Sequence, residues 1–576
     1  MSVNNSSNGT NRGGAMISAQ PNNAQALSPL GWKDLTQGAP SSRDPKARRR
    51  GRILAIASLI LLIMLIFASV RVISVASDSN DHLMLSISNQ QQAVIDLRQS
   101  EPISPYLFGV NVFPKERTLS LDSKEGNYTG FMSYGPQIVN GLQNANVKLL
   151  RFPGGSWGEN EAGQNHILSY DQLYDFSQLL YSVGADGMVQ ARISSPVDAS
   201  GQPATLEQRA HLAGQWVDFM SNPNSQVRKT WETSERLKNV KNVQIHPIKF
   251  WSVGNEPDRL INPDTGKPYT VKEYVEAFIQ FSTFMHQNNP TIKVFGPEIS
   301  QFDGVGMGPK DSEGSLWMDD FLKGVGAYEQ AHKVILLDGV SFHFYPFGNE
   351  GQAPSPSLLM SSAEEWNYML PSLRQLIQQD LGRDAPIAVT EINTNSSVGQ
   401  EPTRGQAALW WGDTLGELMN QQVQYAAYFS AEGVEPPYPL FNNDGSFSQT
   451  AMFRVMQMFT HLQHNLIPLA VQREPISVYA TQDDTHSTVS LLFINKSGSN
   501  QLAHISPENT AFGTSPWQSL DISLKGYSMV LVTLNRSGGA ESYYFDVPTV
   551  NDATISSIQQ VTCGNKTDPL AYNIPC

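Results

Sequence analysis

Ile-Lys-Phe-Trp-Ser-Val-Gly-Asn-Glu-Pro, residues 248–257, is the stretch that decides the fold. It begins as a short apolar run rich in β-forming residues and stops at Gly, Asn and Pro, which interrupt strands. The pattern predicts a buried strand whose C-terminal tip presents Asn255 and Glu256. A solvated glutamate at a strand end would be ordinary. However, residues 386–393 form a second stretch of the same kind, and it also ends its strand with a glutamate, Glu391.

Apolar runs of strand length alternate with helical patterns along the middle of the chain. We predict eight strands at residues 107–112, 147–152, 187–193, 248–253, 292–295, 339–345, 387–392 and 423–429. Helical patterns lie between most of them, for example at residues 206–222, 271–287, 317–328, 363–379 and 405–420. Such alternation is typical of parallel βαβ units, and eight units close into an α/β (β/α)8 TIM barrel, here over residues 101–465. An open doubly wound sheet competes, but no glycine-rich nucleotide loop follows the first strand.

A different pattern follows the helix expected near residues 447–464. Short strands separated by Gly, Ser and Asn turns are expected at residues 476–480, 489–494, 519–524 and 529–534. They predict an additional C-terminal antiparallel β-sandwich domain over residues 466–545. Two more strands, 83–87 and 93–97 in the segment 77–100, precede the barrel and are expected to join this domain, because chain ends of such a body usually come close together.

The last segment, residues 546–576, holds both cysteines of the chain, Cys563 and Cys576. A cysteine pair in an exported chain most simply forms a disulfide, which would close this C-terminal tail. No set of His or Cys ligands surrounds the pair, so the sequence predicts no metal site there.

Charge divides the 576-residue chain unevenly, with a net charge of -14 overall. Residues 1–52 contain 8 Lys and Arg against 2 Asp and Glu, a net charge of +6, so the remainder carries -20. An acidic body argues against nucleic acid as a partner. The polar composition of residues 1–52 predicts a disordered basic tail.

An uncharged apolar run, residues 53–70, follows the basic tail and is long enough for a transmembrane helix. We predict an anchor at residues 53–76, with the tail in the cytoplasm and the body outside it, because basic residues flank the cytoplasmic side of a span. The alternative is a secreted protein. Ser74-Val75-Ala76 resembles a signal-peptide cleavage site, although the long segment before the apolar run favours an uncleaved anchor.

The strand ends resemble those of a known group of enzymes. Asn255-Glu256-Pro257 after strand four, together with Glu391 after strand seven, resembles the retaining glycoside hydrolases of clan A, which are built on (β/α)8 barrels. Three further stretches resemble the arabinofuranosidase, β-xylosidase and β-glucuronidase (heparanase-like) branches of that clan: residues 103–111, 149–155 and 342–346. The resemblance covers roughly residues 90–540.

This resemblance implies a role for each matching residue. Glu256 matches the general acid/base, which requires a raised pKa, and Glu391 matches the nucleophile. The remaining matches imply substrate-binding and orienting roles for Asn255, Arg151, His343 and Tyr345. Trp157 follows a Gly-Gly turn at a strand end and is a candidate sugar platform. Taken singly, Arg151 is also explained by a structural ion pair and His343 by a core histidine. Glu298, after strand five, is the rival carboxylate.

The function expected from these residues is a retaining glycoside hydrolase that cleaves oligo- or polysaccharides by double displacement outside the cytoplasm, without a cofactor or metal. A membrane-tethered carbohydrate-binding or sensor protein on the same scaffold is the alternative, because a barrel alone does not define a function. A binding protein would have no need of both carboxylates. An aldolase-like enzyme would require a lysine at a strand end, and none of the predicted strand ends has one.

The predicted topology can be tested on intact cells. Protease added from outside should digest the body of the protein and spare residues 1–52, because the anchor places them on opposite sides of the membrane. Immunoblots against an epitope at each end would follow the two parts. Protection of the body from external protease would contradict the prediction.

Overall fold

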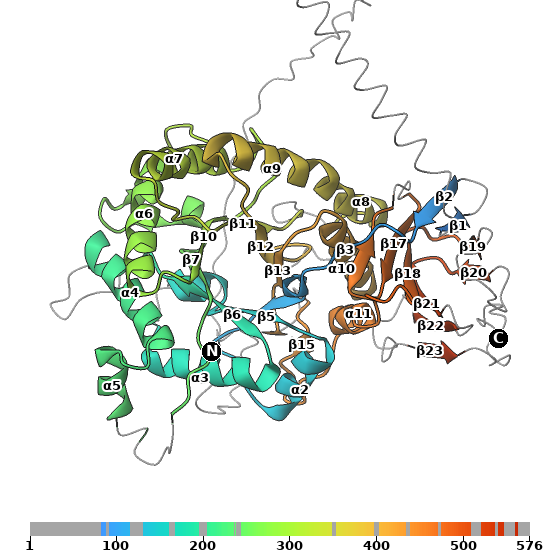
Figure 1. The fold of residues 1–576 in the computed structure, drawn as a ribbon, viewed down its shortest axis with the longest axis horizontal. Coiled ribbons are helices and arrows are strands. Elements are labelled where there is room, and N and C mark those ends of the chain that lie inside the picture. Colours follow the sequence, from blue (N-terminus) through green and yellow to red (C-terminus); the bar gives the residue numbers. More distant parts are fainter. Residues whose placement is uncertain are drawn as a thin grey trace, which may run out of the picture. The chain divides into compact units, whose positions relative to one another are not determined.

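A computed structural model describes residues 82–562, apart from 88–90, 116–130, 160–167, 195–203, 235–236, 238–242, 348–352, 397–401, 434–437, 470–473, 508–519, 536–539 and 547–558. Eight parallel strands form a closed barrel in chain order, and the last pairs with the first (Figure 1). They are β4 (Gly109–Asn111), β5 (Leu149–Phe152), β6 (Asp186–Ala191), β7 (Phe250–Val253), β10 (Lys293–Ile299), β11 (Gly339–Phe344), β12 (Ile387–Ile392) and β13 (Tyr425–Tyr428). The predicted TIM barrel is confirmed.

Helices surround the barrel strands, as Figure 1 shows. The longer ones are α2 (Pro136–Asn144), α3 (Tyr170–Val183), α4 (Leu206–Ser221), α6 (Val271–Asn288), α7 (Trp317–His332), α9 (Trp366–Leu381), α10 (Arg404–Asn420) and α11 (Ala451–Phe459). Thr205, Thr270 and Thr403 begin α4, α6 and α10 with capping boxes. In a capping box the threonine and the residue at N3 satisfy each other's backbone N–H groups, which fixes the start of the helix. The shorter helices are α5 (Gln226–Glu232) and α8 (Pro356–Ser362).

Two predicted helix starts are wrong. Helix α9 begins at Trp366 rather than at residue 363, because residues Ala363–Glu365 form a 3-10 turn before it. Helix α11 begins only at Ala451, because the chain before it runs alongside neighbouring segments. Two backbone hydrogen bonds, from Phe441 N to the Ala431 carbonyl and from Thr450 N to the Leu440 carbonyl, take this stretch out of the helix.

Side chains at the N-terminal end of the barrel fill its interior. Five apolar residues from different strands form one cluster there, namely Leu149, Met188, Phe250, Phe295 and Ala388. Tyr106 and Tyr425 stack against this cluster with ring centroids 5.4 Å apart. Because strand side chains alternate, the residue two positions further on faces the same interior. Arg151 is two residues after Leu149, so its side chain also points into the barrel, in the C-terminal half.

The C-terminal domain consists of two antiparallel sheets around one hydrophobic core. One sheet contains β3 (Glu101–Pro102), β16 (Asn465–Ile467), β17 (Ile476–Gln482), β18 (Thr488–Asn495), β21 (Ser528–Asn535), β22 (Ala540–Asp546) and β23 (Gln559–Thr562). The other contains β1 (His82–Ile87), β2 (Gln91–Asp96), β19 (Gln501–Pro507) and β20 (Leu520–Leu524). Strand β1 pairs with β19, and Leu85 lies opposite Ile505, so the strands that precede the barrel join this domain as expected (Figure 1).

A buried ion-pair cluster joins this domain to the barrel. Lys496, with only 1% of its side chain exposed, lies 3.3 Å from Asp413 of α10 and 2.8 Å from Glu364. Glu474 lies 2.9 Å from the same ammonium group. Burial alone would lower the pKa of Lys496, but the facing carboxylates outweigh it and raise that pKa. Nearby, the Tyr479 hydroxyl donates a hydrogen bond of 2.7 Å to Asp413 Oδ1.

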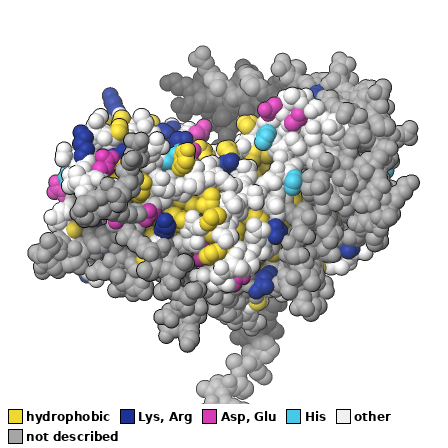
Figure 2. Space-filling model, turned by 90° about the horizontal axis from the view of Figure 1, so that it is seen from below, with side chains coloured by type: hydrophobic (Ala, Val, Ile, Leu, Met, Phe, Trp, Pro, Cys, Tyr) yellow, Lys and Arg dark blue, Asp and Glu magenta, His cyan; other side chains and the backbone are white. Residues whose placement is uncertain are grey.

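Several predicted segments lie outside the described residues, including the tail at 1–52, the anchor at 53–76, and Cys563 and Cys576. Within the described part of the chain, no helix has both the length and the apolar character of a membrane span. On the face of the molecule that Figure 2 shows, Lys and Arg side chains are interspersed with Asp and Glu. The described residues on that face therefore form no continuous basic surface.

Lys496 provides a test of how the two parts are held together. Lys496→Met should lower the free energy of unfolding by about 3–5 kcal/mol, because it leaves the fully buried Asp413 carboxylate without its cation. Lys293→Met is the matched control. Lys293 also pairs with an aspartate at 2.9 Å, but 55% of its side chain is exposed, and its loss should cost less than about 1 kcal/mol. Equal losses in urea unfolding of the two variants would contradict the assignment.

Candidate active site

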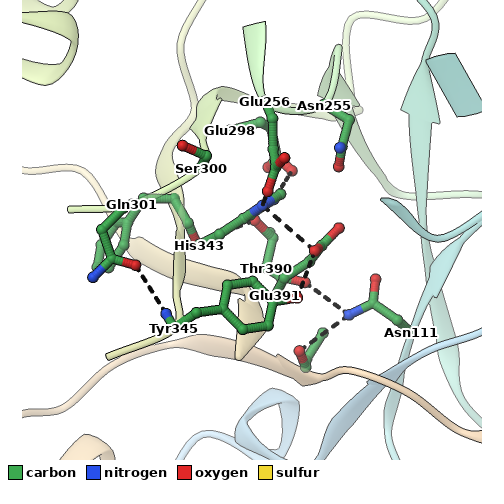
Figure 3. A network of polar contacts seen from close by, with 12 residues as sticks. Asn111, Asn255, Glu256, Glu298, Ser300, Gln301, His343, Tyr345, Thr390 and Glu391 are labelled. Carbon is green, nitrogen blue, oxygen red and sulfur yellow. Dashed lines mark hydrogen bonds and ion pairs between the residues drawn. The ribbon is translucent and has the colours of Figure 1, made fainter. Parts of the chain in front are cut away.

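The C-terminal ends of the barrel strands bring six of the predicted site residues into one polar network, part of which Figure 3 shows. These residues are Arg151, Asn255, Glu256, His343, Tyr345 and Glu391, and direct contacts at 3.5 Å or less connect them. They come from β5, β7, β11 and β12, or from the residues directly after these strands. The motifs found in the sequence therefore meet at the C-terminal end of the barrel, where TIM-barrel enzymes have their active sites.

Arg151 is fully buried and lies at the centre of this network. Its Nη1 donates to Glu391 Oε1 at 2.7 Å and to Asn111 Oδ1 at 2.8 Å. Its Nη2 donates to Glu298 Oε2 at 2.7 Å and to Asn255 Oδ1 at 2.8 Å. One guanidinium group thus orients side chains from four other segments of the barrel, as the planar geometry of its donors allows.

Two partners of Arg151 were not among the residues assigned to the site from sequence. Asn111, at the end of β4, lies within the stretch that resembles the barrel entry, but nothing in the sequence distinguished it. Glu298 was only the rival carboxylate, yet it is completely buried and bound to Arg151. Its position directly after Gly-Pro at a strand end was the available signal.

Irregular backbone directs two of the glutamates into the barrel. Phe295 faces the interior, so regular alternation along β10 would point Glu298 outward. A register shift between Pro297 and Ile299 reverses the alternation, so that Glu298 points inward. Glu298 itself has a φ of 58°. A second shift between Phe342 and His343 of β11 pairs His343 with Glu391. It turns Glu391 inward in the same way. Bulges of this kind re-aim side chains near active sites.

His343 lies between the glutamates and is fully buried. Its Nδ1 lies 3.0 Å from Glu256 Oε1 and 3.5 Å from Glu391 Oε2, and its Nε2 lies 3.5 Å from Glu298 Oε2. Burial alone would lower the pKa of His343, but the three carboxylates outweigh it and raise that pKa to about 10. The imidazole is therefore a cation near neutral pH.

Glu256 differs from the expectation that a general acid has a raised pKa. Burial raises the pKa of Glu256, but the hydrogen bond and the charge of His343 outweigh burial, and that pKa is lowered. Arg259 Nη1 also lies 3.3 Å from Glu256 Oε2. The 3.0 Å contact between Glu256 Oε1 and His343 Nδ1 is short enough for a proton to pass between the two groups.

Glu391 is held from both sides. Arg151 binds its Oε1, and the Tyr345 hydroxyl donates to its Oε2 at 2.8 Å. A glycine is required beside it, because a Cβ atom on Gly155 would lie 3.1 Å from Glu391 Oε1, and Gly155 has a φ of 57°. Two hydrogen-bond donors and this close approach of the backbone give the carboxylate one orientation.

One oxygen of Glu256, one of Glu391 and a nitrogen of His343 lie within 4.8 Å of one another. The same three groups could hold a metal ion by distance alone. However, an imidazolium has no lone pair to donate, and its N–H groups already face the carboxylates. With His343 charged, the arrangement is that of a cation between two acids, which suits proton transfer and nucleophilic attack.

A cavity of about 490 Å³ opens at this network. Glu256 and Tyr345 line it, together with Asp258, Arg259, Ser300, Gln301, Asp303, Gly308, Pro309 and Ser396. Its volume falls within the range usual for small-molecule sites, and its polar lining suits a hydroxyl-rich ligand.

The predicted sugar platform, Trp157, is positioned differently from the other site residues. It lies on the 3-10 turn Gly155–Glu159, next to the glycine that approaches Glu391. The side chain is only 7% exposed and packs edge-to-face on Phe131, with ring centroids 5.9 Å apart. Its ring face is thus not open to a sugar in this structure.

Comparison with known proteins identifies the class. Residues 201–347 match glycoside hydrolase family 44. This segment includes Glu256, Glu298 and His343. No curated protein matches the sequence.

Solved structures resemble the fold at low sequence identity. A family 51 α-L-arabinofuranosidase from Thermotoga petrophila RKU-1 has 16% identity and a TM-score of 0.56, over 76% of this chain and 98% of that one. An α-L-arabinofuranosidase from Thermotoga maritima has 15% identity and a TM-score of 0.54, over 75% and 97%. CelM2, a bifunctional glucanase-xylanase from a metagenome library, has 14% identity and a TM-score of 0.52, over 76% and 97%. At these identities the likeness establishes the fold alone.

The predicted resemblance to (β/α)8-barrel glycoside hydrolases is confirmed, and the protein is a glycosidase by class. The family match covers only part of the chain, residues 201–347, and that part is similar to glycoside hydrolase family 44.

The Tyr345 hydroxyl offers a direct test of the site. Tyr345→Phe should lower kcat/KM by about 10- to 150-fold, because a hydrogen bond to a charged group contributes roughly 1.5–3 kcal/mol. Tyr274→Phe is the control, since Tyr274 is also buried but donates only to the Val253 carbonyl. It should leave kcat/KM within about threefold of the wild type, as its bond is outside the network. Equal activity of Tyr345→Phe and wild type would contradict the assignment.

Proposed function

We propose that this protein is a retaining glycoside hydrolase that cleaves oligo- or polysaccharides by double displacement. The observation that carries the proposal is the distance between the two acids, since one oxygen of Glu256 and one of Glu391 lie within 4.8 Å. Retaining enzymes have carboxyl groups about 5–5.5 Å apart, whereas inverting enzymes need about 6.5–9.5 Å to admit a water molecule. The short distance supports attack by a carboxylate.

In the first step Glu391 attacks the anomeric carbon and forms a glycosyl ester, while the bond from that carbon to the leaving oxygen breaks. Glu391 suits this role because Arg151 and Tyr345 hold both of its oxygens and stabilise its negative charge. The leaving oxygen takes its proton from Glu256, which lines the cavity and receives that proton from His343 across their contact. Glu256 is then left as a carboxylate and His343 as a neutral imidazole.

In the second step water attacks the same carbon from the face that the leaving group vacated. Glu256 accepts a proton from this water and returns it to His343, and the bond between the sugar and Glu391 breaks. Two displacements at one carbon give net retention. Both carboxylates and the proton carrier then return to their starting states.

Separate observations support the proposed substrate and the proposed location. The polar cavity beside Glu256 supports an oligo- or polysaccharide, whose leaving group would occupy it. The apolar run at residues 53–70 after a basic cluster supports an extracytoplasmic body on a membrane anchor. These features suit cleavage of glycans outside the cytoplasm.

Variants of the two acids test the assignment on the full-length protein with a panel of aryl glycosides. Glu391→Gly should lose activity by more than about 10³-fold on every substrate, because it removes the carboxylate that would bond the sugar. Glu256→Ala should lose about 10²–10⁴-fold on substrates with poor leaving groups. On substrates with acidic leaving groups it should release one burst of aglycone and then stall at the covalent intermediate.

Azide distinguishes the two roles further. It should relieve the stall of Glu256→Ala and yield a glycosyl azide with the configuration of the substrate, because azide needs no base to attack. An azide product of inverted configuration from Glu256→Ala would reverse the assignment of the two carboxylates. Glu329→Gln, a change in a buried glutamate outside the site, should keep wild-type activity.

A further inference from the structure

Glu298 is a buried carboxylate that neither displacement step uses. It is completely inaccessible to solvent and lies at the irregular end of β10 with a φ of 58°. A buried charge and a left-handed non-glycine residue each cost free energy. Glu298 contacts Arg151 and His343, which in turn contact the two reacting carboxylates. A buried charge in this position suggests a role in the reaction.

The contacts of Glu298 extend to three parts of the site. Its Oε2 accepts a 2.7 Å hydrogen bond from Arg151 Nη2 and faces His343 Nε2 at 3.5 Å. Its backbone carbonyl accepts a 2.8 Å hydrogen bond from the backbone N–H of Glu256. The side chain therefore adjoins the two buried cations, Arg151 and His343, and the backbone holds Glu256, which lines the cavity.

Glu298 acts through these neighbours, because it has no exposed surface from which to touch a substrate. Arg151 needs two carboxylates as partners, and Glu391 is the other one. His343 likewise has Glu298 on one ring nitrogen and Glu256 on the other. Without Glu298, the imidazolium would have one buried anion fewer to stabilise it.

We infer that Glu298 is a positioning residue that keeps the catalytic proton on the His343–Glu256 pair and holds Glu256 at the cavity. This inference rests on the proposed function, because the proton matters only if Glu256 is the acid. Glu298 itself remains ionised throughout the working range. Burial would raise its pKa, but the charge of Arg151 and the contact with His343 outweigh burial and lower that pKa to about 2.

The sign of the effect follows from the charges that face the pair. His343 faces the carboxylates of Glu256, Glu298 and Glu391. Other ionisable groups lie near the network on the neighbouring elements: Arg151, Asp258, Arg259 and Tyr345. The Tyr274 phenol is uncharged and donates outside the network. Removing the negative charge of Glu298 lowers the proton affinity of the pair. The alkaline limb of the pH–rate profile, where the proton is lost, therefore moves to lower pH.

Glu298→Gln tests this in the full-length protein, because it removes the charge and keeps the shape. On aryl glycosides with poor leaving groups, the alkaline limb of kcat/KM should move down by about one pH unit or more. Leaving groups that need no proton should show a much smaller shift. A profile that coincides with that of the wild type would overturn the inference and leave Glu298 a structural residue.

Glu329→Gln is the matched control. Glu329 is also a buried glutamate, 5% exposed, that accepts two backbone N–H groups and pairs with Arg383. Both variants lose one buried charge and should lose stability, but only Glu298→Gln should shift the alkaline limb. An equal shift in both variants would mean that the shift reflects lost stability, and it would overturn the inference.

The charge of His343 can also be measured directly, without enzyme activity and without a Glu298 variant. Histidine-labelled wild-type protein, observed by NMR, should contain an imidazole still charged at pH 8 that is absent from His343→Asn. No imidazolium signal at pH 8 would overturn the inference. If the wild type cleaves none of the glycosides, the proposed function fails, whereas the charge of His343 is still tested by this experiment.

Discussion

The ion pairs of Arg151 are the interaction on which the site depends. A guanidinium with no solvent exposure is stable inside a barrel only if anions and acceptors surround it. Arg151 obtains two carboxylates, Glu298 and Glu391, at 2.7 Å each. Because these glutamates come from different strands, the need to compensate one buried charge determines where the ends of β5, β10 and β12 lie relative to one another.

The same constraint explains why the network contains three glutamates although the proposed chemistry uses two. Among the buried groups, Arg151 and His343 supply two positive charges, and Glu256, Glu298 and Glu391 supply three negative ones, while Arg259, which also pairs with Glu256, is largely exposed. Because these buried anions outnumber the buried cations, they raise the proton affinity of the His343–Glu256 pair. A site with only the two reacting acids would hold that proton less tightly, since every buried negative charge nearby raises the proton affinity of its neighbours.

The barrel itself supplies the rigidity that this charge cluster requires. Below the cluster, apolar side chains such as Phe250 and Phe295 close the N-terminal end of the interior. Outside it, helix α10 is buried along nearly its whole length and carries Asp413, which pairs with Lys496 of the C-terminal domain. The two-sheet domain therefore braces the outer side of the barrel, opposite to the interior where the charges meet.

Sequence alone determined the architecture of the barrel and most of the site. Each of the eight strands is a short apolar run, and burial on both faces requires that composition wherever such a strand occurs. Glu256 and Glu391 could be found because each directly follows or ends such a run. What the sequence could not reveal is which way the side chains point once a strand becomes irregular. Only the tertiary structure, through the register shifts at Glu298 and between β11 and β12, turned two glutamates inward and made Glu298 the partner of Arg151. The same holds for the lowered pKa of Glu256, because it arises from His343, which lies 87 residues away in the chain and 3.0 Å away in space.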